Sequence, residues 1–202
     1  MIEAIIFDFG DVIYRVDNNK IIKNLSKFTD TPEKELKAAI YQEHAISREY
    51  ENGLITFDQF FQEIVRKGSL KITPDEFIKA YCDKFTVMKP TLELIKRLKE
   101  EGYSLGLISN ADELDFEYAI KTCEIFPLFD AVSLSFEVKE MKPNEKMFRD
   151  SLRKLGKRPE ECVYIDNIKE FADASSRLGI HGIHYTGYSQ LIGTLRDLEV
   201  RI

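Results

Sequence analysis

Hydrophobic residues follow two different periods along the chain. Residues 4–9 (AIIFDF) form an apolar run interrupted only by Asp8, as is typical of a strand buried on both faces. From residue 17 to residue 89 the apolar residues recur instead at three- and four-residue spacing, which predicts amphipathic helices. Helix starts are indicated by a hydroxyl residue followed by Pro, Glu or Gln, at Thr31, Thr56 and Thr73. We therefore expect roughly four helices in this stretch and no strand.

After residue 89 the pattern changes to an alternation of helices and strands. Glycines that end helices stand at Gly102, Gly156 and Gly179. Helices are predicted over 90–101, 112–121, 145–155, 169–178 and 188–198, and strands over 103–108, 131–134, 162–165 and 180–185. This alternation predicts an α/β fold, a Rossmann-like parallel sheet with helices on both faces. We expect an α/β core over residues 1–16 and 89–202, and an inserted all-helical cap over 17–88 that covers the carboxyl ends of the strands.

Polar residues follow the predicted strands at the edge where ligands bind to open α/β sheets. The strands and the loops after them supply Asp8, Ser109, Asn110, Lys142, Asp166 and Asn167. Taken singly, an Asp or Ser after a strand commonly caps the next helix, and a lone lysine is usually solvated. Their coincidence at one edge favours a functional site.

These residue types suit phosphoryl transfer. Two aspartates and backbone carbonyls offer the oxygen ligands that Mg²⁺ prefers, and Mg²⁺ is commonly shared with a substrate phosphate. A hydroxyl and backbone N–H groups can cradle a phosphoryl group, and a lysine adds a positive charge. A carboxylate can attack phosphorus and form an aspartyl-phosphate.

Composition narrows the choice of partners. The chain has 202 residues, of which 44% are hydrophobic, and a net charge of −6. The charge excludes the basic footprint of a nucleic-acid-binding protein and disfavours a membrane surface. Cys82, Cys123 and Cys162 have no paired spacing and are expected to be reduced thiols. With no signal-peptide pattern and no long apolar run, we expect a cytoplasmic protein, a monomer or a homodimer.

Four motifs in order make the chain resemble the haloacid dehalogenase (HAD) superfamily of hydrolases, in the subclass with a helical cap between the first two motifs. The motifs are IIFDFGDVI, LGLISNAD, EMKPNEKMF and VYIDNIKEFADASSRLGI, and together they span nearly the whole chain. They contain Asp8, Ser109, Lys142 and Asp166 respectively.

The resemblance implies roles for these residues. Asp8 would be the nucleophile and a Mg²⁺ ligand, with the Gly10 carbonyl and Asp166 as further ligands. Ser109 and the Asn110 backbone would bind the phosphoryl group. Lys142 would pair with Asp8 and the phosphate. The cap would close over the site, exclude water and select the substrate.

Two positions depart from the family pattern. Family phosphatases usually carry a second aspartate two residues after the nucleophile, as the acid–base group, and here that position is Gly10. Asp11 is one residue further, where an extended chain would direct it to the other side. A second acid often follows the fourth-motif aspartate, and here it is Asn167. Whether Asp11, a water or the substrate transfers the proton stays open.

Few other residues indicate chemistry. Arg48 in the helical stretch could reach a substrate anion, although a surface position is the commoner role of such a residue. His44, His181 and His184 have no metal-ligand spacing with the acids.

The leading hypothesis is a Mg²⁺-dependent phosphatase acting on a small phosphorylated metabolite, with a sugar phosphate as one candidate, through an aspartyl-phosphate on Asp8. One alternative is a catalytically weak HAD-fold protein that binds a phosphometabolite or a protein, because Gly10 and Asn167 depart from the pattern. Another is a metal-independent 2-haloacid dehalogenase, in which the aspartate attacks carbon; Asp166 disfavours it because that chemistry needs no metal.

Overall fold

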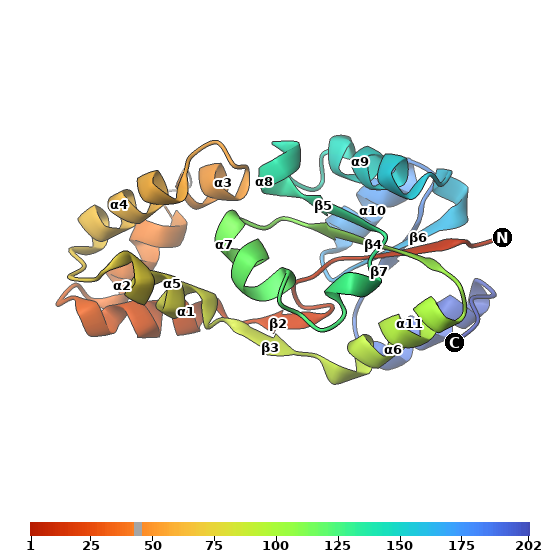
Figure 1. Ribbon diagram of the computed structural model, residues 1–202, viewed down its shortest axis with the longest axis horizontal. Coiled ribbons are helices and arrows are strands. Elements are labelled where there is room, and N and C mark those ends of the chain that lie inside the picture. Colours follow the sequence, from red (N-terminus) through yellow and green to blue (C-terminus); the bar gives the residue numbers. More distant parts are fainter. Residues whose placement is uncertain (43–45) are drawn as a thin grey trace.

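A five-stranded parallel sheet forms the centre of the molecule in the computed structural model, which describes residues 1–42 and 46–202. The strand order is β5-β4-β1-β6-β7 (Figure 1). The strands are β1 (Ala4–Phe7), β4 (Ser104–Ser109), β5 (Ala131–Leu134), β6 (Cys162–Asp166) and β7 (His181–His184). All neighbouring pairs are parallel, so the predicted α/β fold is confirmed. His44 lies outside the described residues.

Helices cover both faces of this sheet (Figure 1). Ile5 and Phe7 pack on one face with α6 (Lys89–Glu100) and α11 (Tyr188–Asp197). Ala4 and Ile6, which alternate with them along β1, belong to the other face. That face is covered by α9 (Glu145–Leu155) and α10 (Lys169–Arg177). Burial on both faces explains why β1 is apolar without alternation.

Among the described residues, five α-helices between β2 and β3 form a second unit, which we call the helical insert. They are α1 (Asn18–Leu25), α2 (Glu33–Lys37), α3 (Ile46–Glu51), α4 (Phe57–Gly68) and α5 (Pro74–Cys82). The helices share an apolar core that includes Phe60 and Phe77, whose rings meet edge to face at 6.0 Å. Thr56 and Thr73 each cap a helix through a reciprocal capping box, as the sequence predicts.

Two short strands connect the helical insert to the sheet. β2 (Tyr14–Val16) and β3 (Phe85–Val87) pair antiparallel as a separate two-stranded ribbon. The prediction that residues 17–89 contain no strand is therefore wrong for β3. Each strand has only three residues, too few to establish a two-residue period against the helical pattern around it.

The remaining elements are mostly as predicted, with ends shifted by a residue or two. The helix expected over 112–121 begins as α7 (Glu113–Asp115) and continues as a wider π-helical turn over Phe116–Ile120. A four-residue helix, α8 (Ser135–Val138), was not predicted. Further single turns occur at Ser26–Phe28, Ala38–Gln42, Phe126–Leu128 and Pro159–Glu161.

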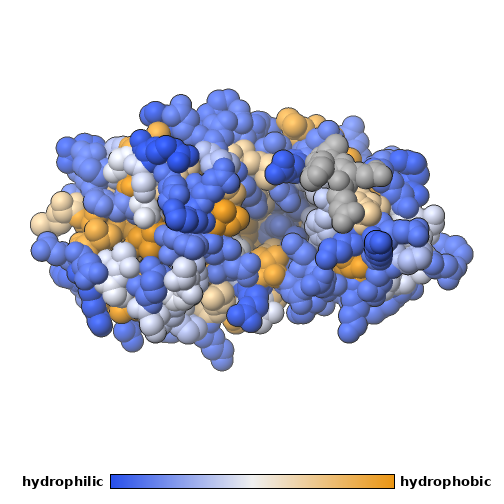
Figure 2. Space-filling model, turned by 180° about the vertical axis from the view of Figure 1, so that it is seen from behind, coloured by the Kyte–Doolittle hydropathy of each residue, from blue (hydrophilic) through white to orange (hydrophobic). Residues whose placement is uncertain are grey.

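One face of the molecule is largely hydrophilic (Figure 2). Figure 2, which views the molecule from behind, shows polar side chains over most of this face and a hollow near its middle. Among the described residues, no helix is both long and apolar enough to cross a bilayer.

Candidate active site

A cavity of about 310 Å³ lies where the helical insert meets the carboxyl ends of the strands. Five of the predicted site residues line it: Asp8, Gly10, Ser109, Asn110 and Lys142. Asp8 directly follows β1, and its backbone N–H continues the ladder by donating to Ile165 at 2.9 Å. Asp166, the last residue of β6, is fully buried and reaches the same cluster through Lys142. The topology thus brings the predicted residues together.

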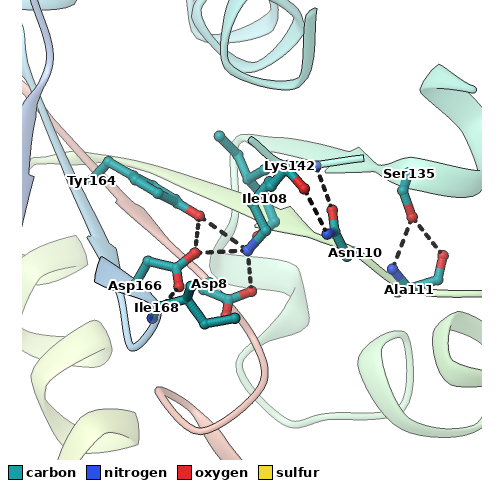
Figure 3. Close-up of polar contacts among 9 residues, drawn as sticks. All are labelled: Asp8, Ile108, Asn110, Ala111, Ser135, Lys142, Tyr164, Asp166 and Ile168. Carbon is teal, nitrogen blue, oxygen red and sulfur yellow. Dashed lines mark hydrogen bonds and ion pairs between the residues drawn. The ribbon is translucent and has the colours of Figure 1, made fainter. Parts of the chain in front are cut away.

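Lys142 is the centre of the polar cluster (Figure 3). Its Nζ atom lies 2.7 Å from Asp8 Oδ1 and 2.8 Å from Asp166 Oδ2. The lysine side chain is 1% exposed and those of the two aspartates 10% and 0%. A buried lysine between two buried carboxylates avoids the large cost of an unpaired charge, while the cluster keeps a formal excess of one negative charge.

Tyr164 completes this cluster and was not predicted from the sequence. Its hydroxyl donates to Asp166 Oδ2 through a short hydrogen bond and accepts one from Lys142 Nζ at 3.0 Å (Figure 3). Tyr164 stands two residues before Asp166 on β6, and side chains two apart share a face of a strand. That alternation is the signal that could have found it.

Burial and the neighbouring charges shift the pKa of Asp8, the candidate nucleophile. Burial, together with the charge of the neighbouring Asp166, raises the pKa of Asp8 to about 6. Lys142 opposes the rise through its positive charge and its hydrogen bond. A carboxyl with this perturbation beside a cavity is typical of a functional site.

Ser109 and Asn110 follow one another at the end of β4. Ser109 is buried and lines the cavity. The Asn110 side chain accepts from the Lys142 backbone N–H at 2.8 Å and donates to the Lys142 carbonyl at 3.3 Å. These two bonds hold the Lys142 loop against β4. Because they engage the side-chain amide of Asn110, the backbone N–H of Asn110 is the group available to a phosphate.

Gly10 and Asp11 form the turn after Asp8 and Phe9. A Cβ atom at Gly10 would come within 3.3 Å of Val16 Cγ2, so the valine occupies the space beside that position. Asp11 adopts a left-handed conformation with φ of 53°. One of its carboxylate oxygens accepts the Val16 backbone N–H at 3.1 Å. The Asp11 carboxylate therefore serves the turn, as Asx-type caps do.

The donor set fits Mg²⁺. Among the described residues no group of three or more His, Cys, Asp or Glu side chains could hold a metal ion. Two carboxylates completed by the Gly10 carbonyl and by water match the usual Mg²⁺ preference for few protein ligands. Asp166 Oδ1 accepts one hydrogen bond, from Ile168 N–H at 2.8 Å, and keeps a second lone pair. Asp8 and Asp166 also carry one more negative charge than Lys142 balances.

The far wall of the cavity is polar and includes the helical insert. Glu51, Lys84 and Asp115 line it, and none of them was predicted. Lys84 and Asp115 form an ion pair at 2.6 Å. None of the three stands at the carboxyl end of a strand of the central sheet, because Glu51 ends α3, Lys84 precedes β3 and Asp115 ends α7, so the rule of strand ends does not find them.

Of the other polar residues considered from the sequence, only Asn167 lines the cavity among the described residues. Arg48 is exposed and does not line it. His181 and His184 contact backbone carbonyls, of Glu160 at 3.3 Å and of Asn167 at 3.1 Å, and have structural positions.

Comparisons with known proteins identify the family to which the chain is similar. A family model of haloacid dehalogenase-like hydrolases matches residues 2–168. The chain is 26% identical over 215 residues to glyceraldehyde 3-phosphate phosphatase of Methanopyrus kandleri, covering 100% of this chain and 89% of that protein. It is 25% identical over 174 residues to D-ribitol-5-phosphate phosphatase of Bacteroides thetaiotaomicron, covering 83% and 84%.

A solved structure shares the fold. It is a HAD family enzyme of Bacteroides thetaiotaomicron in complex with magnesium and inorganic phosphate. The TM-score is 0.81 at 22% sequence identity, and the match covers 95% of this chain and 99% of that one.

Proposed function

The chain belongs to the haloacid dehalogenase-like hydrolases, and from this premise we propose that it is a Mg²⁺-dependent phosphatase of small phosphorylated metabolites. One observation carries the proposal. Lys142 lies 134 residues from Asp8 in sequence, yet its Nζ atom is 2.7 Å from Asp8 Oδ1 at the wall of a cavity that Ser109 also lines.

The proposed reaction begins with attack of an Asp8 carboxylate oxygen on phosphorus. Lys142 holds that carboxylate in place and offers positive charge to the phosphoryl oxygens. Ser109 and the Asn110 backbone N–H would bind the same oxygens. Mg²⁺, held by Asp8, Asp166 and the Gly10 carbonyl, would neutralise negative charge on the phosphate. Water then releases phosphate from Asp8.

We propose that the helical insert acts as a cap that selects the substrate. It contributes Glu51 to the cavity, so a substrate would touch both units of the protein. The wall carries several charged groups, which suits a polar leaving group such as a sugar or polyol. The phosphatases of Methanopyrus kandleri and Bacteroides thetaiotaomicron named above act, by their names, on compounds of this kind.

The experiment is a screen of phosphorylated metabolites with and without Mg²⁺. We expect turnover that requires Mg²⁺ and falls at least about a thousandfold in Asp8→Asn, because the amide cannot form the phosphoenzyme. Turnover by Asp8→Asn at the wild-type rate would reject the assignment. Tight phosphate-ligand binding without turnover of any compound would instead favour a binding protein.

A further inference from the structure

Phosphoryl transfer from an alkyl ester requires a proton for the departing oxygen. An alkoxide is a poor leaving group, and a positioned acid typically accelerates such a step by about 10²–10⁴. The position two residues after Asp8 is Gly10, which has no side chain, and Val16 lies 3.3 Å from where its Cβ would be. The proton therefore needs a source other than residue 10, and the side chains that line the cavity are the candidates that the structure describes.

Most titratable side chains at the cavity wall already have partners. Among the described residues that line it, the titratable ones are Asp8, Asp11, Glu51, Lys84, Asp115 and Lys142. Lys142 pairs with Asp8, and Lys84 pairs with Asp115 at 2.6 Å. Asp11 accepts the Val16 backbone N–H. Within this set, only the Glu51 side chain makes no hydrogen bond or ion pair with the part of the chain that the structure describes.

The backbone at Glu51 is nevertheless held firmly to the core. Glu51 is the last residue of α3, and its carbonyl accepts a hydrogen bond from Ser135 Oγ at 2.6 Å. Two residues on, the Gly53 carbonyl accepts from Lys139 Nζ at 2.5 Å. A fixed backbone with an unpartnered carboxyl facing the nucleophile's cavity is the arrangement expected of a group that acts on a ligand.

We propose that Glu51 is the acid–base residue of this phosphatase, in the role of the aspartate that Gly10 replaces; the inference rests on the function proposed above. In the first step Asp8 attacks phosphorus, the bond from phosphorus to the ester oxygen breaks, and the Glu51 carboxylic acid gives its proton to that oxygen. The products are an alcohol, the aspartyl-phosphate and the Glu51 carboxylate.

In the second step water attacks the phosphorus of the aspartyl-phosphate. The Glu51 carboxylate takes a proton from that water, and the bond between phosphorus and the Asp8 oxygen breaks. Inorganic phosphate and the Asp8 carboxylate are released, and Glu51 is again protonated, so the net reaction consumes one water per ester.

The surroundings of Glu51 suit both steps. Burial, together with the charges of Asp112 and Asp115, raises its pKa to about 7, against the opposing charges of Lys84 and Arg48. The charge of Glu51 in turn contributes to the raised pKa values of the Tyr41 and Tyr81 phenols. A carboxyl that titrates near neutrality can both give and accept a proton at ordinary pH.

The test compares leaving groups in Glu51→Gln. p-Nitrophenolate leaves without a proton, whereas the alkoxides of glyceraldehyde 3-phosphate and D-ribitol 5-phosphate do not. Because kcat/KM reports the step in which the leaving group departs, we expect it to fall about 10²–10⁴-fold for the alkyl esters and less than about tenfold for p-nitrophenyl phosphate. In Glu51→Gln the aspartyl-phosphate should be hydrolysed slowly, so p-nitrophenyl phosphate should give an initial burst of p-nitrophenol. In wild type, alkyl-ester activity should fall above neutral pH as Glu51 loses its proton, and this fall should be absent in Glu51→Gln.

Glu49→Gln is the matched control, since Glu49 lies on the same helix but does not line the cavity. It should behave as wild type. Equal losses on both ester classes in Glu51→Gln, or no loss on either, would overturn the role of Glu51 while leaving an Asp8-dependent phosphatase intact. Absence of Asp8-dependent turnover in the wild type would instead reject the proposed function itself.

Discussion

The ammonium group of Lys142 lies between the carboxylates of Asp8 and Asp166 and beside the Tyr164 phenol. An ammonium has three protons to donate, and these three oxygens are its nearest acceptors. Tyr164 in turn donates to Asp166, so its hydroxyl orients a proposed metal ligand and the lysine together. Partners of this kind commonly tune metal affinity and activity without touching the substrate.

Removing only that hydroxyl tests the contribution of Tyr164. In Tyr164→Phe the ring should keep its edge-to-face contact with Phe148 at 5.2 Å, while Asp166 and Lys142 lose a partner. We expect the free energy of unfolding to fall by about 1–2 kcal/mol and the Mg²⁺ affinity to change about tenfold or more. Urea denaturation and Mg²⁺ titration by calorimetry measure the two effects.

Tyr103→Phe is the matched control for this prediction. The Tyr103 hydroxyl accepts a hydrogen bond from the Arg201 backbone at 2.9 Å and lies outside the cavity wall. The variant Tyr103→Phe should lose a comparable amount of stability, and its Mg²⁺ affinity should be unchanged. If Tyr164→Phe binds Mg²⁺ as wild type does, the hydroxyl has a purely structural role.

At the level of single residues, the sequence identifies site residues at strand ends and misses those that a distant helix contributes. Asp8, Ser109 and Asp166 were predictable because parallel strands present their carboxyl ends at one edge. Glu51 was not, because no local pattern relates the end of α3 to that edge. Its position depends on contacts such as that between Ser135 and the Glu51 carbonyl.

At the level of elements, length decides what a periodic pattern can predict. α9 (Glu145–Leu155) has the predicted ends, helped by Asn144 as its N-cap and Gly156 in left-handed conformation after it. β2, β3 and α8 have three or four residues each, so none completes enough periods to be recognised. These short elements are nonetheless the ones that place the helical insert against the sheet.

The short helix α8 supports a prediction about its first residue, Ser135. Its hydroxyl has one proton, which the 2.6 Å contact assigns to the Glu51 carbonyl, and it accepts the Ala111 N–H at 3.0 Å. Ser135→Ala leaves both backbone groups without that partner. We expect a loss of about 1–3 kcal/mol in stability and faster amide hydrogen exchange in α3.

Ser151 provides the opposite case. It is as fully buried as Ser135, within α9, but its hydroxyl has no hydrogen-bond partner among the described residues. Ser151→Ala removes an unsatisfied polar atom and improves helix propensity, so it should leave stability unchanged or raise it by up to about 1 kcal/mol. Equal destabilisation by both substitutions would mean that the Ser135 contacts do not hold α3.

At the level of the whole molecule, the apolar packing around the sheet and the apolar core of the helical insert meet across a polar junction. The cavity opens at this junction. Glu51, Lys84, Asp112 and Asp115 gather near this junction, where burial is costly for charged groups. Such a concentration of partly compensated charge is typical of a site kept for function at the expense of stability.

That cost predicts how stability depends on pH. Burial raises the pKa of Glu51 from its ordinary 4.5 to about 7, so between these values the folded chain binds more protons than the unfolded one. The free energy of unfolding should then fall as pH rises through this range. Glu51→Gln cannot titrate, so it should match wild type near about pH 5 and be more stable by roughly 1–3 kcal/mol near about pH 8.

Urea denaturation at the two pH values checks this expectation, with Glu49→Gln as the control for loss of a charge on α3. The buried Asp115 carboxyl, whose pKa is also raised to about 7, remains in both proteins, so a smaller slope should persist in Glu51→Gln. A structural glutamate would give the reverse result, a variant less stable than wild type at high pH. Greater stability together with the loss of alkyl-ester hydrolysis would identify Glu51 as a carboxyl that serves catalysis at a cost in stability, as active-site residues commonly do.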